Sequence, residues 1–101
     1  MEIALRHHRS RKGRGDLCSE AAANTRRCFE SLRADPLSTR DPDRQHRLHG
    51  RLATRTVGGR GLPQWEFEVT AGGRVRYLVD EAGHTVHLVY ASTRHPEDTD
   101  I

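Results

Sequence analysis

The sequence is poor in features that define several large protein classes. Its aromatic residues are one Trp, two Tyr and two Phe among 101 residues. No apolar run approaches the roughly 20 residues that a membrane-spanning helix needs, and no signal-peptide pattern opens the chain. We therefore expect a cytoplasmic protein that does not engage a membrane. The length suits one small domain with a single modest core.

Cysteine is also scarce, with only Cys18 and Cys28 in the chain. On one helix these residues would lie about 15 Å apart along the axis, because each residue rises about 1.5 Å. A disulfide needs Cα atoms within roughly 7 Å, so we expect none between them, which fits a reducing compartment. No activating pattern surrounds Cys28, which we expect to be a small core residue rather than a nucleophile.

Metal-binding patterns are weak. There is no CxxC, and HxxH occurs at His46/His49 and at His84/His87. Residues three apart on a strand point to opposite faces, so His84 and His87 cannot share an ion there. Two histidines without a third ligand leave His46 and His49 a poor zinc site. We expect no bound metal and no other cofactor.

Charge is unevenly distributed along the chain. Residues 1–61 hold 14 Lys/Arg and 7 Asp/Glu, whereas residues 62–101 hold 3 and 7. A basic first part favours an anionic partner such as nucleic acid. Its run HHRSRKGRG, at His7–Gly15, has no apolar period. We expect residues 1–15 to form a flexible basic arm that either contacts nucleic acid or only aids solubility, and residues 16–101 to form one domain.

One amphipathic helix is expected after the arm, capped by Asp16 or Ser19 and running to about Ala34. It presents small or apolar residues at helical spacing, namely Ala21, Thr25, Cys28 and Leu32. Asp35-Pro36 ends it, because the residue before proline avoids helical geometry. A loop over 37–45 follows, then HRLHGRLA and a flexible TRTVGGRG connection, which lacks the GK[ST] ending of a phosphate-binding loop.

Three runs predict strands that form an antiparallel meander. Gln64–Thr70 and Arg74–Asp80 alternate in side-chain character, and His84–Ala91 is apolar at nearly every position. Short glycine-containing turns join the runs. Met1–Leu5 suggests a further short strand. The sequence thus predicts an α+β fold with one main helix packed on a meander of three to four strands.

Turns of three residues would also fix the register. The expected opposite pairs are Val69/Val75, Glu68/Arg76, Tyr77/His87 and Arg74/Tyr90. One face then forms the core, with Trp65, Phe67, Val69, Val75, Tyr77, Val79 and Val89. The other face carries Glu66, Glu68, Arg74 and Arg76 beside Leu88 and Tyr90. Cross-strand Glu–Arg pairs of this kind stabilise a sheet by roughly 0.2–1 kcal/mol each. Such pairing is one full explanation of why this face is charged.

A second explanation is RNA cleavage through attack by the RNA's own 2′-OH, which needs a base, an acid and a cation at the phosphorane. Histidine suits the proton transfers because its reference pKa of about 6.5 is near working pH. Arginine suits the phosphate because its fork binds two oxygens at once. The sheet offers Arg74 and Arg76, and Arg94 and His95 follow it, although these last two are also typical of an exposed tail.

The order of these segments resembles the RelE/ParE toxins of type II toxin–antitoxin systems. The resemblance is carried by the helix, Asp-Pro, "HRLHGRLA", the glycine-rich loop, "WEFEV", "GGRVRYLVDEAGHTVHLVYA" and "RHP". The family's leucine–x–glycine segment, strands and terminal basic/histidine motif match Leu48/Gly50, Trp65–Val69, Arg74–Tyr77 and Arg94-His95. The match covers roughly residues 20–97, and it lies in order and spacing rather than in a single motif.

The resemblance implies a small bacterial toxin that is an mRNA interferase, a metal-independent endoribonuclease that cuts ribosome-bound mRNA and is held inactive by an antitoxin. Arg74 matches the arginine that contacts the phosphate. His95 matches the acid of the YoeB-like branch, and His46 holds the base position, which is a glutamate there. The further residues expected to bind RNA are Arg76, Arg94, Arg47 and Arg51.

Some positions depart from that family. Glu66 and Glu68 replace strand lysines, Pro96 follows His95 where a terminal tyrosine is expected, and HHRSRKGRG stands in for a first helix. The alternatives are therefore a ParE-like inhibitor of DNA gyrase, which cleaves nothing, and a member without catalytic activity. We expect the antitoxin to bind exposed apolar groups, such as Leu78, Leu88 and Tyr90.

Overall fold

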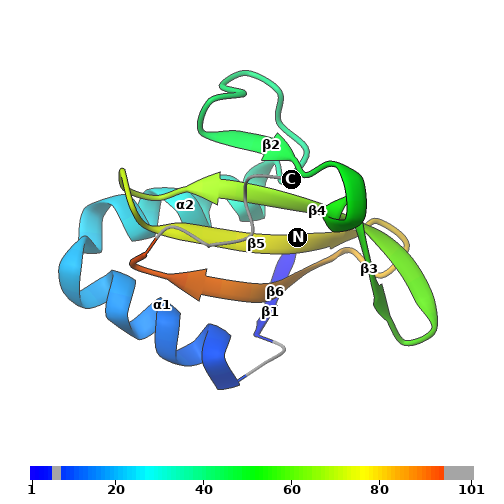
Figure 1. The fold of residues 1–101 in the computed structure, drawn as a ribbon, viewed down its shortest axis with the longest axis horizontal. Coiled ribbons are helices and arrows are strands. Elements are labelled where there is room, and N and C mark those ends of the chain that lie inside the picture. Colours follow the sequence, from blue (N-terminus) through cyan, green and yellow to red (C-terminus); the bar gives the residue numbers. More distant parts are fainter. Residues whose placement is uncertain (6–7, 95–101) are drawn as a thin grey trace.

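A computed structural model describes residues 1–5 and 8–94 and shows an α+β fold (Figure 1). The helices are α1 (His8–Glu20), α2 (Ala22–Ala34) and the short 3-10 helix η1 (Gly50–Leu52). The strands are β1 (Glu2–Leu5), β2 (Gln45–Arg47), β3 (Thr54–Val57), β4 (Arg60–Glu68), β5 (Arg74–Asp80) and β6 (Thr85–Ser92). No helix in the described part of the chain is long and apolar enough to cross a membrane.

The sheet is mixed, with strand order β1-β6-β5-β4-β2 and with β3 paired to the far end of β4. The predicted meander is confirmed, because β4, β5 and β6 pair antiparallel in sequence order. The predicted N-terminal strand also exists as β1, but it runs parallel to β6. The sheet is therefore broader than the three to four strands expected, and it is not purely antiparallel.

The helical layer differs from the prediction. Two helices separated at Ala21 replace the single helix, and α1 includes residues 8–15, which we expected to be a flexible arm. The buried face of α1, which meets the sheet, consists of two small residues, Ser10 and Gly13, and one large apolar residue, Leu17. A Cβ at Gly13 would lie 1.7 Å from the carbonyl oxygen of Ala91 on β6. This close approach of helix and strand lets a segment with few large apolar residues fold onto the sheet.

The core lies between the helices and one face of the sheet. From α2 it receives Thr25, Cys28, Phe29 and Leu32, at the predicted spacing. From the sheet it receives Trp65, Phe67, Val69, Val75, Tyr77, Val79, Val86, Leu88 and Ala91. Burial raises the pKa of the Cys28 thiol, which therefore stays protonated. Its expected role as a small core residue is confirmed.

The predicted strand register is wrong by two residues between β4 and β5. Residues 69–73 form a longer connection than expected, so Glu66 lies opposite Arg76 and Glu68 opposite Arg74. A register shift of two residues leaves every side chain on the face predicted for it, because side chains alternate between the two faces of a strand. The core face predicted for these two strands, which includes Trp65, is therefore correct.

The register of β6 is wrong in a way that exchanges faces. A β-bulge lies opposite Arg76/Tyr77 and leaves Val89 as the extra residue. Leu88 pairs with Tyr77 and lies in the core, whereas Val89 packs with Leu62 and Leu78 on the opposite face. The assignment of Val89 to the core face and of Leu88 to the outer face is thus reversed.

The segment predicted as a flexible connection is an ordered hairpin. β3 and β4 are antiparallel and joined by Gly58 and Gly59, with Val57 opposite Arg60. Both glycines have positive φ, of 57° and 79°. A two-residue loop of this kind matches the right-handed twist of the paired strands, and glycine adopts it without steric cost.

A buried tyrosine anchors the long loop between α2 and β2. The Tyr77 hydroxyl donates to the Pro36 carbonyl at 2.8 Å and accepts from Gln45 Nε2 at 2.9 Å. Burial raises the pKa of Tyr77, so the phenol remains a donor. The two contacts fix both ends of the loop 35–44 to the sheet.

A second polar anchor holds the tip of the β3–β4 hairpin. Asp80 on β5 binds the Arg60 guanidinium through both carboxylate oxygens, at 2.6 and 3.3 Å. Asp80 also accepts from the Gly83 amide at 2.9 Å and lies 3.6 Å from His87 Nε2. The Arg60 hydrogen bonds, followed by that of Gly83, lower the pKa of Asp80 to about 2.

Replacing Gly13 tests the close packing of α1 on β6. We expect Gly13→Ala to lower the free energy of unfolding by about 3 kcal/mol, because the methyl group would collide with the β6 backbone. Gly15→Ala is the matched control. It lies on the same helix with nothing within 4 Å of its Cβ position, and it should raise stability by about 0.5–1 kcal/mol. Urea unfolding measures both changes, and equal effects would contradict this packing.

Acid unfolding tests the Asp80 anchor. Its folded pKa lies below the ordinary value of about 3.9, so its stabilisation is present above pH 4 and is lost as the pH falls towards 2. Asp80→Asn should therefore have a lower melting temperature than the wild type near pH 6, and the gap should narrow between pH 4 and pH 2. Asp43→Asn, in the exposed loop, should show little gap. A gap for Asp80→Asn that stays constant with pH would contradict the ion pair.

Candidate functional site

Polar side chains form a row across four strands on the outer face of the sheet, the face turned away from the helices. His46 on β2 lies opposite Glu66 on β4, Glu66 lies opposite Arg76 on β5, and Arg76 lies opposite Tyr90 on β6. Residues directly opposite each other on neighbouring strands point to the same face of a sheet. The four side chains therefore form a continuous line from β2 across β4 and β5 to β6. This row, with Arg74 beside it, is the candidate site.

Glu66 is the centre of the row. Its side chain is only 5% exposed, and its Oε2 lies 3.0 Å from Arg76 Nε. Its other oxygen, Oε1, lies 3.7 Å from Arg74 Nε and 4.0 Å from His46 Nε2. A buried carboxylate is costly unless it is paired, and here three cationic or potentially cationic groups surround it. The sheet therefore assembles His46, Arg74 and Arg76 around one carboxylate.

His46 is the most accessible of these groups, with 39% of its side chain exposed. Its Nδ1 lies 3.0 Å from the Pro42 carbonyl oxygen, which can only accept, so Nδ1 carries a proton. In the neutral ring the lone pair is then on Nε2, the nitrogen that faces Glu66. A lone pair on Nε2 can accept a proton from a substrate that reaches this accessible ring.

Arg74 is largely committed to the connection between β4 and β5. Its Nη1 donates to the carbonyl oxygens of Thr70, Ala71 and Gly73 at 2.9, 3.1 and 3.1 Å. Its Nη2 lies 3.8 Å from Glu68, whose side chain is 35% exposed. Arg74 therefore orders the loop with Nη1, while its Nη2 lies near the more exposed Glu68.

Arg76 joins Glu66 to the aromatic end of the row. Its guanidinium carbon lies 5.5 Å from the centre of the Tyr90 ring, within the range of a cation–π contact. The side chain is 6% exposed. Its charge is thus shared between a carboxylate and an aromatic face, and it contributes to the electrostatics of the site from beneath the surface.

The other predicted RNA-binding residues do not meet at Glu66. Arg47 is exposed and donates through Nη2 to the Ala53 carbonyl at 3.1 Å. Arg51 is exposed on η1, and Arg94 is exposed with its backbone amide bound to Ser92 Oγ. The predicted acid, His95, lies outside the described residues. The structure thus brings two of the three predicted catalytic residues, His46 and Arg74, to one carboxylate.

The expected antitoxin contacts need correction. Leu78 and Leu88 have no exposed surface. Leu78 packs with Leu62 and Val89, and Leu88 lies in the core. They cannot be exposed contacts for a partner. Tyr90 is half-buried and remains accessible at the end of the row.

Glu66 is the site residue whose role sequence reasoning missed. The alternation of β4 places Glu66 on the face of the arginines, and the sequence indicated cross-strand Glu–Arg pairing there without a central position for Glu66. Its central position depends on the register between β4 and β5, which the turn length sets.

Within the described residues, no group of three or more His, Cys, Asp or Glu could hold a metal ion.

Comparisons with known proteins give one informative result. No protein-family model matches the sequence, and no curated protein matches it. Among solved structures, the chain is similar to a copper-bound point mutant of a toxin from Helicobacter pylori, with a TM-score of 0.65 and 17% sequence identity. The similarity covers 91% of this chain and 92% of that one. The chain therefore has the fold of that toxin along nearly its whole length.

Proposed function

We propose that this protein is the toxin of a type II toxin–antitoxin system, of the RelE/ParE family, and that it cleaves ribosome-bound mRNA without a metal ion. The fold shared with the Helicobacter pylori toxin supports the toxin role. The observation that carries the enzymatic part is His46, which is accessible, fixed by Pro42 and directed at Glu66 beside two arginines.

The reaction begins at the ribose next to the scissile phosphate. His46 Nε2 removes the proton of the 2′-OH, and the 2′-oxygen attacks phosphorus. The 5′-oxygen of the next nucleotide leaves and takes up a proton, which leaves a 2′,3′-cyclic phosphate. Glu66 stabilises the imidazolium formed on His46, and a positioned base of this kind typically contributes 10²–10⁴-fold. His95 is the proposed acid, by its place in the family's terminal motif.

The arginines supply the positive charge that the phosphorane needs. We assign this role to Arg74 Nη2, because Nη1 is held by three loop carbonyls, and a phosphate bound there would replace the 3.8 Å contact of Nη2 with Glu68. Arg76 lies deeper and raises the local potential, although Glu66 offsets part of its charge. The exposed Arg47, Arg51 and Arg94 contact the RNA backbone, to which they bring charge without base specificity.

A second candidate function is supported by the same carboxylate. Glu66 contacts both Arg74 and Arg76, and their side chains are only 10% and 6% exposed. Cations that are already paired and covered attract a phosphate weakly. This favours the non-catalytic alternative, a ParE-like protein that inhibits DNA gyrase by binding, or a member without activity.

The antitoxin is the proposed regulatory partner in either case. Leu78 and Leu88 are buried, so the partner surface on the sheet is reduced to the region of Tyr90 and the accessible edge at His46. An antitoxin that covers this edge would block the proposed base and the approach of RNA together.

Ribosome-dependent mRNA cleavage tests the catalytic assignment. We expect His46→Ala to lower the cleavage rate by about 10²–10⁴-fold and Arg74→Ala by about 10²–10³-fold, because they remove the base and a phosphorane-stabilising charge. His95→Ala should have an effect like that of His46→Ala. The matched control is His49→Ala, an exposed histidine three residues from His46 and outside the row, which should cleave like the wild type.

Circular dichroism of each variant separates catalysis from folding, which matters for Arg74 because it orders a loop. Cleavage that survives His46→Ala would contradict the assigned base. Wild-type protein that cuts no RNA but inhibits supercoiling by gyrase would establish the second candidate instead.

A further inference from the structure

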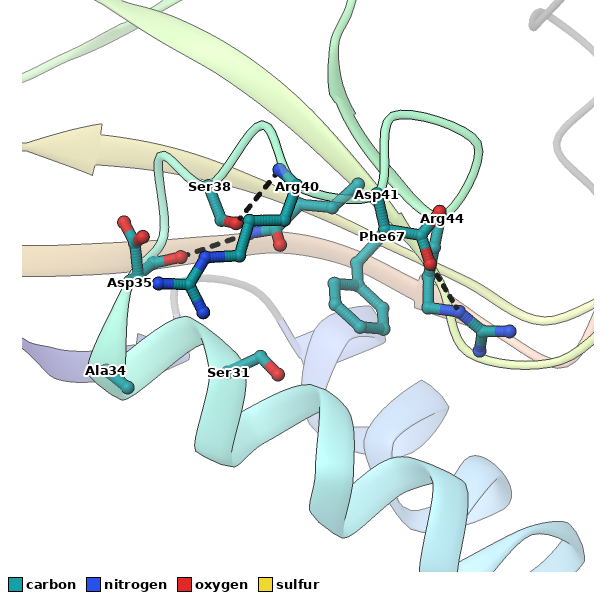
Figure 2. A pocket seen from close by; sticks show the side chains of 9 residues that line it. Ser31, Ala34, Asp35, Ser38, Arg40, Asp41, Arg44 and Phe67 are labelled. Carbon is teal, nitrogen blue, oxygen red and sulfur yellow. Dashed lines mark hydrogen bonds and ion pairs between the residues drawn. The ribbon is translucent and has the colours of Figure 1, made fainter.

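A cleft of about 600 Å³ lies on the helical side of the sheet, between the C-terminal end of α2 and the loop 35–44. Figure 2 shows Ser31 and Ala34 on α2 facing Ser38, Arg40 and Asp41 on the loop, with the Phe67 ring pointing from β4 into the space between them. This volume is in the usual range for a small-ligand site. A smaller cavity of about 120 Å³ continues it along α2.

Three arginines line the cleft and its extension, and two aspartates, Asp35 and Asp41, line the main cavity with them. Arg40 and Arg44 line the main cavity, and Arg27 with Arg44 lines its extension. Arg44 lies 3.6 Å from Asp41, and Arg27 donates to the Asn24 side chain at 3.1 Å. The Arg40 guanidinium has no hydrogen bond or ion pair with any described residue. The cleft thus holds an uncommitted cation whose natural partner is an anionic group.

Two carboxylates in the same lining narrow the ligand class. Asp35 and Asp41 line the same cavity as Arg40, and Figure 2 shows the Asp41 carboxylate turned towards Arg44. The side chains of an acidic peptide would pair with Arg40 but would offer no hydrogen-bond donor to Asp35 and Asp41. A nucleotide satisfies both kinds of group, because its phosphate is anionic while its ribose hydroxyls and base amino groups donate hydrogen bonds. Its flat base also makes the apolar contact that the Phe67 ring offers.

We propose that this cleft binds one nucleotide of single-stranded RNA. Arg40 holds the phosphate, Asp35 and Asp41 accept hydrogen bonds from the ribose or the base, and the base lies against Phe67. That the ligand is RNA rests on the proposed function, whereas the ligand class rests on the lining.

The cleft is joined to the candidate site through β2 and the loop before it. Gln45, which lines the cleft, and His46, which points to the outer face, are adjacent on this edge strand. The loop that carries Arg40 and Asp41 also supplies the Pro42 carbonyl that fixes His46 Nδ1. An RNA strand that passes around the β2 edge would reach both places, and a nucleotide in the cleft would hold the loop that orients His46.

The test is a titration of the purified protein, without ribosomes, against a fluorescently labelled ten-nucleotide single-stranded RNA. Arg40→Ala should weaken binding about tenfold, since a charge-assisted hydrogen bond of this kind is lost. Arg33→Ala is the matched control, because Arg33 is exposed on α2 and outside the lining. It should change the affinity by less than about twofold, as expected for an exposed charge that makes no phosphate contact.

Asp35→Asn separates a built site from general attraction. Removing a negative charge would strengthen binding if RNA were held by non-specific electrostatics alone. Asn keeps one acceptor oxygen but replaces the other with an amino donor, so a site that uses both carboxylate oxygens should bind RNA more weakly instead. Circular dichroism checks that each variant is folded, and both substitutions are at exposed positions.

Equal losses from Arg40→Ala and Arg33→Ala, or tighter binding by Asp35→Asn, would overturn the proposal. So would a glutamate-rich octapeptide that binds in an Arg40-dependent way while RNA does not. If the wild type cleaves mRNA and Arg40→Ala binds RNA as tightly as the wild type, RNA binding by the cleft is contradicted and the proposed function stands. If RNA binding depends on Arg40 but no RNA is cleaved, RNA binding by the cleft stands and the proposed nuclease activity is contradicted.

Discussion

The buried carboxylate of Glu66 is the constraint on which the outer face of this protein depends. It lies 3.0 Å from Arg76, 3.7 Å from Arg74 and 4.0 Å from His46, and little of it reaches solvent. An unpaired carboxylate at that depth would be strongly destabilising, so the fold requires cationic partners around it before any function is considered. The same requirement places a histidine and two arginines within reach of one another.

Backbone geometry determines which groups meet there. The five-residue connection 69–73 sets Glu66 opposite Arg76, and Arg74 orders that connection by binding three of its carbonyls. The bulge at Val89 in β6 then turns Tyr90 towards Arg76. On the other side, Tyr77 fixes the loop whose Pro42 carbonyl orients His46. The site and the cleft behind β2 are therefore consequences of two loops, the register between β4 and β5, and the bulge in β6.

The sequence predicted the parts that a regular pattern encodes. Alternation in residues 64–80 placed Trp65 and Tyr77 in the core and Glu66 with the arginines outside, and these assignments hold because a register error of two preserves the face. β6 is apolar on both faces, so its sequence does not indicate which residues point to the core. The bulge that exchanges the faces of Leu88 and Val89 could therefore not be predicted from the sequence. Residues 8–15 of α1 were not predicted as helix, because the buried face of α1 is Ser10, Gly13 and Leu17, which carries almost no hydrophobic period.

A double-mutant cycle between Glu66 and Arg76 tests the central claim most directly, because it isolates the pair from every other contact of either side chain. Unfolding of Glu66→Gln, Arg76→Gln and the double variant should give a coupling energy of about 2 kcal/mol, in the upper part of the range for contacting residues. The same cycle on the more exposed pair Glu68 and Arg74, 3.8 Å apart, should give less than about 1 kcal/mol. A Glu66–Arg76 coupling near zero, or one no larger than that of the exposed pair, would contradict the account.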